Sequence, residues 1–487
     1  MHTKRMVFVL IFSFLAFSCR SANGQATVPD SAPANAIAAN NVNQTSFSMP
    51  LSGSVIDPNQ LTYLGAFRLP GGGDPPKTFA YGGNAMTFNP DGDPGNLDAH
   101  SGSLFIMGHD RVAYSGVPDG NQVAEVTIPE PILSREISAL NAAEFLQDFS
   151  DVTRGYFTQL EEIPKVGMQY LNHPATGPLI HLTWGQHLQP PDVASQAWFN
   201  PELRSANLQG TWFIGDQDLY SVNGYMMDIP QEWADEFTDS KPLATGRMRD
   251  GGQGGMGPAL FAYQPWAADG SPAADGTRLD ETTLLLYETV YNTEIIERAM
   301  DGYQHADEWE GAAFLTDASG GSAVIFSGTK AGGEKYWYGY MHPDDPSAVC
   351  VDAHVTDFPT CRNADGSVCS VSDLKGCCDE EQGTCVSNRG WWSNRFDAEI
   401  IFYDPADMAR VALGEMEPWE PQPYAVLDID EYLYLSPPEW DLVMLGAGDQ
   451  RRYRIGDAAF DRENGFLYIL ELFTDEAKPV VHVWSIN

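Results

Sequence analysis

The chain has no apolar run long enough for a membrane-spanning helix, which needs ~20 residues. Its apolar segment Val7–Phe17 spans 11 residues and is interrupted by Ser13. Because this segment follows Lys4 and Arg5 and precedes small residues, it is typical of a signal peptide. We predict a signal peptide over residues 1–24 and no transmembrane span.

Residues 25–54 are poor in large apolar side chains, which predicts a flexible linker ahead of a folded domain. Two export routes fit the preceding junction. Signal peptidase could cut before Gln25, after the small residues Ala22 and Gly24, or Cys19 could carry a lipid anchor. Either route predicts a secreted, periplasmic or cell-surface protein.

Basic residues are scarce. The chain has 27 Lys and Arg against 67 Asp and Glu, for a formal net charge of −40. This balance argues against nucleic acid as a partner, because phosphate binding needs Lys and Arg. It also disfavours adhesion to an anionic membrane. Solubility, including in a salty habitat, explains the excess of acids, and binding of multivalent cations is the alternative.

Cysteine is absent from most of the mature chain. Apart from Cys19, all cysteines fall within residues 350–385. In an exported chain an even number of cysteines indicates disulfides, which here would staple an insertion and not the main fold. Zinc is the competing interpretation, although the CxxC pairs of a zinc ribbon are missing. The cysteines concerned are Cys350, Cys361, Cys369, Cys377, Cys378 and Cys385.

Several enzyme motifs are also missing. The glycine-rich segment 251–257 lacks the GK[ST] ending of a P-loop, and there is no GxSxG elbow or HExxH helix. These absences weaken the esterase and zincin interpretations. Since the mature cysteines are expected to pair, a lone catalytic cysteine is disfavoured as well.

Short apolar segments bounded by Gly, Pro, Asn and Asp dominate the rest of the chain, which predicts an all-β fold. Helical periodicity is confined to three short segments, 138–148, 231–237 and 405–413. The predicted strands include 61–69, 102–110, 123–129, 177–185, 283–291, 322–330, 398–404 and 465–473.

A weak internal repeat occurs at residues 83–89, 311–315 and 456–461, where small residues shortly precede an aromatic and a second strand follows. Small residues suit the innermost strands of a β-propeller, which crowd a central channel. We therefore predict a propeller of about six to seven blades over residues 55–487, closed by pairing of 480–484 with 61–64. A β-sandwich array or a β-rich two-domain protein is the alternative.

Several phrases resemble those of exported bacterial proteins of β-propeller type. The resemblance runs from about Leu61 to the end of the chain and implies the fold, with no established activity to transfer. The cysteine insertion is not a general feature of that group. The phrases are YLGAFRLP (63–70), YGGNAMTFNP (81–90), LFIMGHD (104–110), YQHADEWEGAAF (303–314) and PWEPQPYA (418–425).

The densest group of chemically active side chains lies between His305 and Glu310. On a strand, His305, Asp307 and Trp309 would share one face. Histidine with carboxylates can form a general base or a metal site, and Asp307 with Glu310 would suit calcium. An acidic turn before a buried tryptophan is the structural alternative.

A second candidate is His109, at the end of a predicted strand, which could act as a proton shuttle; a hydrogen-bonded strand cap is the alternative. The basic run 451–454 also stands out in so acidic a chain. Arginine binds carboxylates, and histidine can abstract a proton, as a polysaccharide lyase acting on uronic acids requires. Ion pairing with the many acids is the alternative. The residues expected in catalysis are His109, His305, Asp307 and Arg452, and those expected to contact substrate are Tyr81, Trp309, Lys330 and Arg454.

Aromatic side chains and polar strand ends favour a carbohydrate ligand. The first hypothesis is therefore a propeller that binds or degrades an extracellular glycan, including a lyase. The alternatives are a non-catalytic binding or scaffold propeller at the cell surface and a calcium-dependent, lactonase-like hydrolase. Whether the protein is an enzyme stays open at this point.

Overall fold

A computed structural model describes residues 53–93, 100–108, 122–157, 165–185, 192–247, 255–287, 298–304, 306–337, 391–436 and 448–486. These residues fold into a β-propeller of five sheets, or blades. The all-β propeller prediction is confirmed, but six to seven blades is wrong. The predicted signal peptide, residues 25–52 of the predicted linker and the predicted cysteine insertion 350–385 lie outside the described residues.

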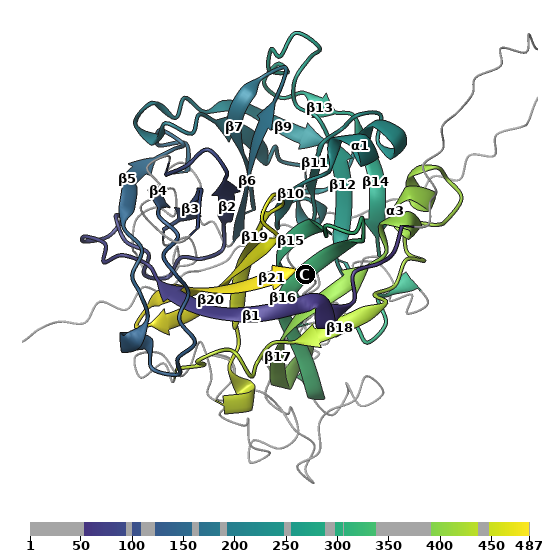
Figure 1. Ribbon diagram of the computed structural model, residues 1–487. Coiled ribbons are helices and arrows are strands. Elements are labelled where there is room, and N and C mark those ends of the chain that lie inside the picture. Colours follow the sequence, from purple (N-terminus) through teal and green to yellow (C-terminus); the bar gives the residue numbers. More distant parts are fainter. Residues whose placement is uncertain are drawn as a thin grey trace, which may run out of the picture. The chain divides into compact units, whose positions relative to one another are not determined.

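Each blade contributes one inner strand to a ring around the propeller axis (Figure 1). Consecutive inner strands contact each other, and the last contacts the first, so five blades close the ring. The inner strands are β2 (Met86–Asn89), β6 (Lys165–His173), β10 (Met226–Asp228), β15 (Glu308–Thr316) and β19 (Ile455–Asp461).

The outer strands follow each inner strand in antiparallel order, with β13 added in parallel to blade two. Blade one adds β3 (Ser103–Met107), β4 (Gln122–Val126) and β5 (Phe145–Asp151); blade two adds β7 (Gly177–Gly185), β8 (Gln196–Phe199), β9 (Gln209–Ile214) and β13 (Arg278–Leu279). Blade three adds β11 (Leu243–Thr245), β12 (Ala259–Tyr263) and β14 (Glu281–Leu286); blade four adds β16 (Ser322–Trp337), β17 (Trp391–Tyr403) and β18 (Ala425–Asp428). Blade five adds β20 (Phe466–Asp475), β21 (Lys478–Ile486) and β1 (Leu61–Arg68).

Blade five joins the two ends of the propeller, as predicted. Strand β1 pairs antiparallel with β21, with Tyr63 opposite Trp484. A buried chain of polar groups crosses this blade: the Tyr63 hydroxyl lies 2.9 Å from His482 Nδ1, and His482 Nε2 lies 2.9 Å from a Glu471 carboxylate oxygen. Glu471 also accepts hydrogen bonds from the backbone N–H groups of Tyr434 and Leu435, which ties the preceding loop to the closing sheet.

The inner ring packs through small residues, as the repeated segments predicted. The backbone of Gly456 approaches that of Gly83 so closely that a Cβ on Gly456 would lie 2.0 Å from the Gly83 carbonyl oxygen. A Cβ on Gly311 would lie 2.4 Å from the Ala458 nitrogen. These contacts are why side chains larger than glycine are excluded where neighbouring blades meet.

Two short α-helices occur in the described residues. The segments 231–237 and 405–413 form α1 (Gln231–Phe237) and α3 (Pro405–Ala412), as predicted. The helix predicted over 138–148 is wrong, because Phe145–Asp151 forms the edge strand β5 with alternating burial. Apolar side chains pack between neighbouring blades, and no described helix is long and apolar enough to cross a membrane.

The contact between Gly456 and Gly83 gives a direct test of ring packing. Gly456→Ala is expected to lower the free energy of unfolding in urea by about 1–3 kcal/mol, the usual range for overpacking, because the added methyl meets backbone. Gly71→Ala is the matched control, since nothing lies within 4 Å of its added Cβ. Equal stability of the two variants would contradict the proposed packing.

Candidate functional site

The inner strands begin at one end of the propeller, which we call the leading end. Its axis is occupied by Lys165, whose side chain is fully buried. The Lys165 ammonium donates at 2.8 Å to the Asn84 carbonyl, the Glu310 carbonyl and a Glu310 carboxylate oxygen. Asn84 Nδ2 also donates to the Glu310 carboxylate at 3.1 Å.

Asp457, on β19, adds a second carboxylate to this junction. Its two oxygens accept the backbone N–H groups of Met86 and Ala458 at 2.8 and 2.9 Å. Burial raises the pKa of Asp457 to about 8, although Lys165 opposes the shift. Lys165 therefore lies near two buried carboxylates, and the raised pKa of Asp457 favours its protonated form at neutral pH.

Asp307 and Lys330, both predicted from the sequence, form an ion pair of 2.9 Å. The buried Asp307 carboxylate also accepts the backbone N–H groups of Gln304 and Ala331, each at 2.9 Å. Burial raises the pKa of Asp307, and Lys330 opposes the shift. With three donors around it, Asp307 orients the Lys330 ammonium.

Glu399, on β17, was not predicted. It lies opposite Gly328, two residues before Lys330 on β16. Burial raises the pKa of this half-buried side chain to about 7, with Lys330 opposing the shift. A carboxyl group of this pKa can exchange a proton near neutral pH. No sequence pattern predicts the raised pKa of Glu399, because its burial depends on the neighbouring strands.

Asp307 and Glu310, predicted as metal ligands, are each held by a lysine. Within the described ranges, no group of three His, Cys, Asp or Glu side chains could hold a metal ion. The partner expected for both residues, His305, lies outside the described residues, as does His109. A calcium site therefore stays a prediction.

The basic run 451–454 is buried. Arg451 donates to the carbonyls of Ser436, Leu472 and Phe473, and burial lowers its pKa to about 10. Arg454 forms an ion pair of 2.7 Å with Asp430 and also donates to the Arg451 carbonyl. These two arginines hold loops at the leading end in place.

Arg452 belongs to a different group of side chains. Its guanidinium carbon lies 5.2 Å from the centre of the Tyr453 ring. Tyr453 and Tyr81 pack against Leu472 and Phe473, and the rings of Tyr81 and Phe473 are 6.3 Å apart. The structure thus brings two predicted residues, Tyr81 and Arg452, into one aromatic cluster.

The backbone of this cluster is unusual. Tyr81, Tyr453 and Phe473 have φ angles of 66°, 50° and 53°. Bulky residues rarely adopt this left-handed region, and residues held there cluster at functional sites. We call the group formed by Arg68, Tyr81, Arg452, Tyr453, Phe473, Asp475 and Lys478 the blade-five patch; Arg452 and Phe473 are its buried members, and Arg68, Tyr81 and Tyr453 are partly exposed. It is the candidate functional site.

Trp309, expected to contact substrate, and His181 both lie in the core. Trp309 is 1% exposed and packs between blades three and four. His181 is fully buried with Trp198 and Trp266 at ring distances of 5.6 Å. Neither ring nitrogen of His181 has a hydrogen-bond partner among the described residues, and burial lowers its pKa to about 3.

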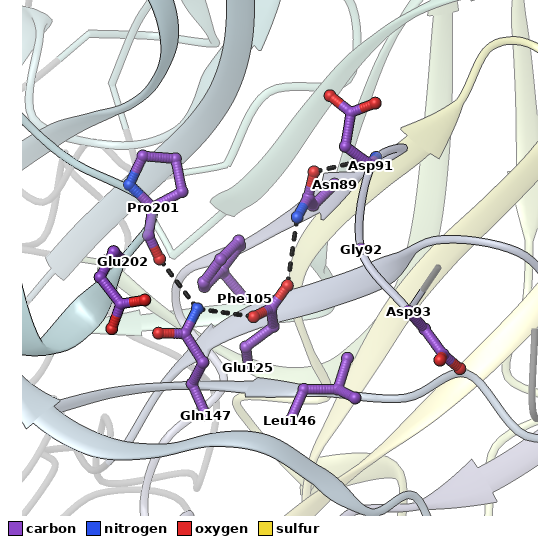
Figure 2. A pocket seen from close by; sticks show the side chains of 10 residues that line it. All are labelled: Asn89, Asp91, Gly92, Asp93, Phe105, Glu125, Leu146, Gln147, Pro201 and Glu202. Carbon is purple, nitrogen blue, oxygen red and sulfur yellow. Dashed lines mark hydrogen bonds between the residues drawn. The ribbon is translucent and has the colours of Figure 1, made fainter. Parts of the chain in front are cut away.

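A separate pocket of about 290 Å³ opens at the opposite end, between blades one and two. Figure 2 shows a chain of hydrogen bonds inside it: Glu125 accepts from Asn89 and Gln147, and Gln147 also donates to the Pro201 carbonyl. Asp91, Asp93 and Glu202 complete its acidic lining. It contains none of the residues predicted to bind substrate.

Neither a family model nor a curated protein matches the chain. Among solved structures, the chain is similar to the PQQ domain of pyranose dehydrogenase from Coprinopsis cinerea in its holo form, with 10% identity and a TM-score of 0.30. The similarity covers 85% of this chain and 98% of that chain. At this TM-score, nothing about a cofactor or an activity follows for this chain.

Asp457 should make the protein less stable as pH rises. The folded state keeps a proton that the unfolded state, with a carboxyl pKa of about 3.9, has already released. The free energy of unfolding should therefore fall as the pH rises from about 3.9, the pKa of the unfolded carboxyl group, to about 8. Urea titrations across this range should show a smaller fall for Asp457→Asn. Asp216→Asn, whose side chain is 99% exposed, should keep the wild-type slope.

His181 should act in the opposite direction. Below the unfolded histidine pKa of about 6.5, the unfolded state binds a proton that the folded state refuses until about pH 3, so stability falls as pH falls. In thermal melts, the His181→Leu variant should not show this loss of stability at low pH. At pH 7 the variant should be as stable as the wild type or about 1–3 kcal/mol more stable, because two orphaned nitrogens are removed. A clear loss of stability at pH 7 would refute this interpretation.

Proposed function

We propose that the protein is an exported propeller that binds an extracellular glycan at the blade-five patch. The observation that carries the proposal is the cluster of three aromatic residues held in left-handed backbone. Each such residue costs of order 1–3 kcal/mol and persists only where its surroundings enforce it. Arg451 supplies that enforcement at Phe473 by donating to its carbonyl.

The chemistry of the cluster suits a sugar. Tyr81 and Tyr453 are partly exposed, so each offers part of an apolar ring together with a polar hydroxyl. Carbohydrates present apolar ring faces with hydroxyl groups at their edges, and such faces pack on aromatic rings. The buried Arg452 lies against the ring of Tyr453.

A second candidate, a polysaccharide lyase, is favoured by the side chains of Lys330 and Glu399. Lys330 is oriented by Asp307, and Glu399 has a pKa of about 7, which suits a group that transfers protons at neutral pH. Ultraviolet absorbance of an unsaturated product would distinguish cleavage from binding. Loss of that absorbance in Glu399→Gln, with glycan binding retained, would support the lyase.

The binding proposal predicts the effect of removing one ring. Tyr453→Ala should weaken binding to the polysaccharide selected from a panel by about tenfold, because an aromatic contact contributes up to about 1.5 kcal/mol. Calorimetric titration measures the affinity. Tyr424→Ala is the matched control, since Tyr424 is 38% exposed and lies on blade four, away from the patch. Equal binding by both variants, or no binding across the panel, would refute the proposal.

A further inference from the structure

The blade-five patch brings two cations to one carboxylate. Arg68 and Lys478 both form ion pairs with the carboxylate of Asp475. Glu476, in the adjoining turn, adds a second acid. Across the whole chain, acids outnumber bases 67 to 27. The ion-pair group around Asp475 reverses that ratio, with two cations to one carboxylate.

Asp475 holds two of these cations in fixed positions. Its carboxylate oxygen lies 3.1 Å from Arg68 Nε and 2.8 Å from Lys478 Nζ. Burial alone would raise the pKa of Asp475, but Lys478 and Arg68 outweigh it and keep the pKa below its ordinary value. The carboxylate therefore stays ionised, and two cations share one negative charge.

Arg68 is arranged to bind a second carboxylate. Asp475 engages its Nε, and no bond from its two Nη atoms is seen within the described ranges. The side chain is 32% exposed. A guanidinium fixed through Nε retains N–H groups for a bidentate contact with another carboxylate. Since Asp475 sets the orientation, less side-chain entropy is lost when the ligand binds.

The aromatic and basic parts of the patch are joined by backbone. The Tyr81 N–H donates to the carbonyl of Ala477 at 2.8 Å, within the turn between Asp475 and Lys478. Tyr81 in turn packs against Phe473, two residues before Asp475. A sugar ring that packs on Tyr81 would therefore lie close to Asp475, which binds Arg68 and Lys478.

We propose that the glycan bound at this patch contains uronic acid, with its carboxylate at Arg68 and Lys478 and a sugar ring on Tyr81. This inference rests on the proposed glycan binding and names the chemical class of the ligand. The mature protein with its full chain is the test sample.

Two probes separate charge from sugar recognition: an oligogalacturonate and the same oligomer with every carboxyl group methyl-esterified. In calorimetric titrations at neutral pH and physiological salt, the acid should bind about tenfold more tightly than the ester, as expected for one charge-assisted hydrogen-bonded contact.

The variant that tests the cations is the triple substitution Arg68→Gln, Asp475→Asn and Lys478→Gln, which keeps polar groups while removing all three charges. It should bind the acid as weakly as the ester, and its ester affinity should equal that of the wild type. The control is Arg410→Gln with Asp407→Asn, which removes a partly exposed ion pair of 3.2 Å on α3.

Each outcome has one meaning. Equal binding of acid and ester by the wild type, or an acid preference that survives the triple substitution, overturns the uronate inference and leaves glycan binding standing. A folded wild-type protein that binds neither oligomer overturns the inference as well, and if it also binds nothing on the polysaccharide panel, the proposed function fails with it. Melting temperatures of the triple variant and the control identify any loss of binding that comes from unfolding.

Discussion

The Lys165 ammonium at the propeller axis is the interaction on which the leading end depends. A buried charge is tolerated only when it is paired and fully hydrogen-bonded, and all three Lys165 donors have partners. Those partners come from the inner strand of blade four and the segment that leads into blade one. These hydrogen bonds form only if the inner strands keep fixed positions relative to one another. The close backbone contacts at the glycines of the ring allow this.

The polar groups at this end of the propeller fall into two sets. Asp307, Glu310 and Arg454 belong to inner strands or directly precede them, and they are already paired within the protein. Tyr81, Tyr453 and Arg68 keep part of their surface exposed. In the proposed function, the paired groups hold the fold together and the exposed groups contact the glycan.

The sequence predicted those parts of the fold that carry local patterns. Apolar strands and the small residues of β2, β15 and β19 could be recognised, whereas β10 and β11 have three residues each and show no period. Because such short strands carry no pattern, the blades could not be counted from the sequence. Asp307 and Lys330 were both selected, but their contact depends on the pairing of β15 with β16. Phe473 was missed because its signal is a backbone angle and not a residue type.

An acidic protein and an acidic glycan repel each other at long range, which raises the question of how a net charge of −40 is compatible with a uronate ligand. Screening answers it, because charges in water more than about 8 Å apart interact weakly at physiological ionic strength. A bound carboxylate would therefore interact mainly with Arg68, Lys478 and Asp475, which lie within one ion-pair group. Partial burial strengthens these contacts relative to the distant surface acids. The local arrangement of a few charges, and not the charge of the whole chain, decides which ligand the patch can hold.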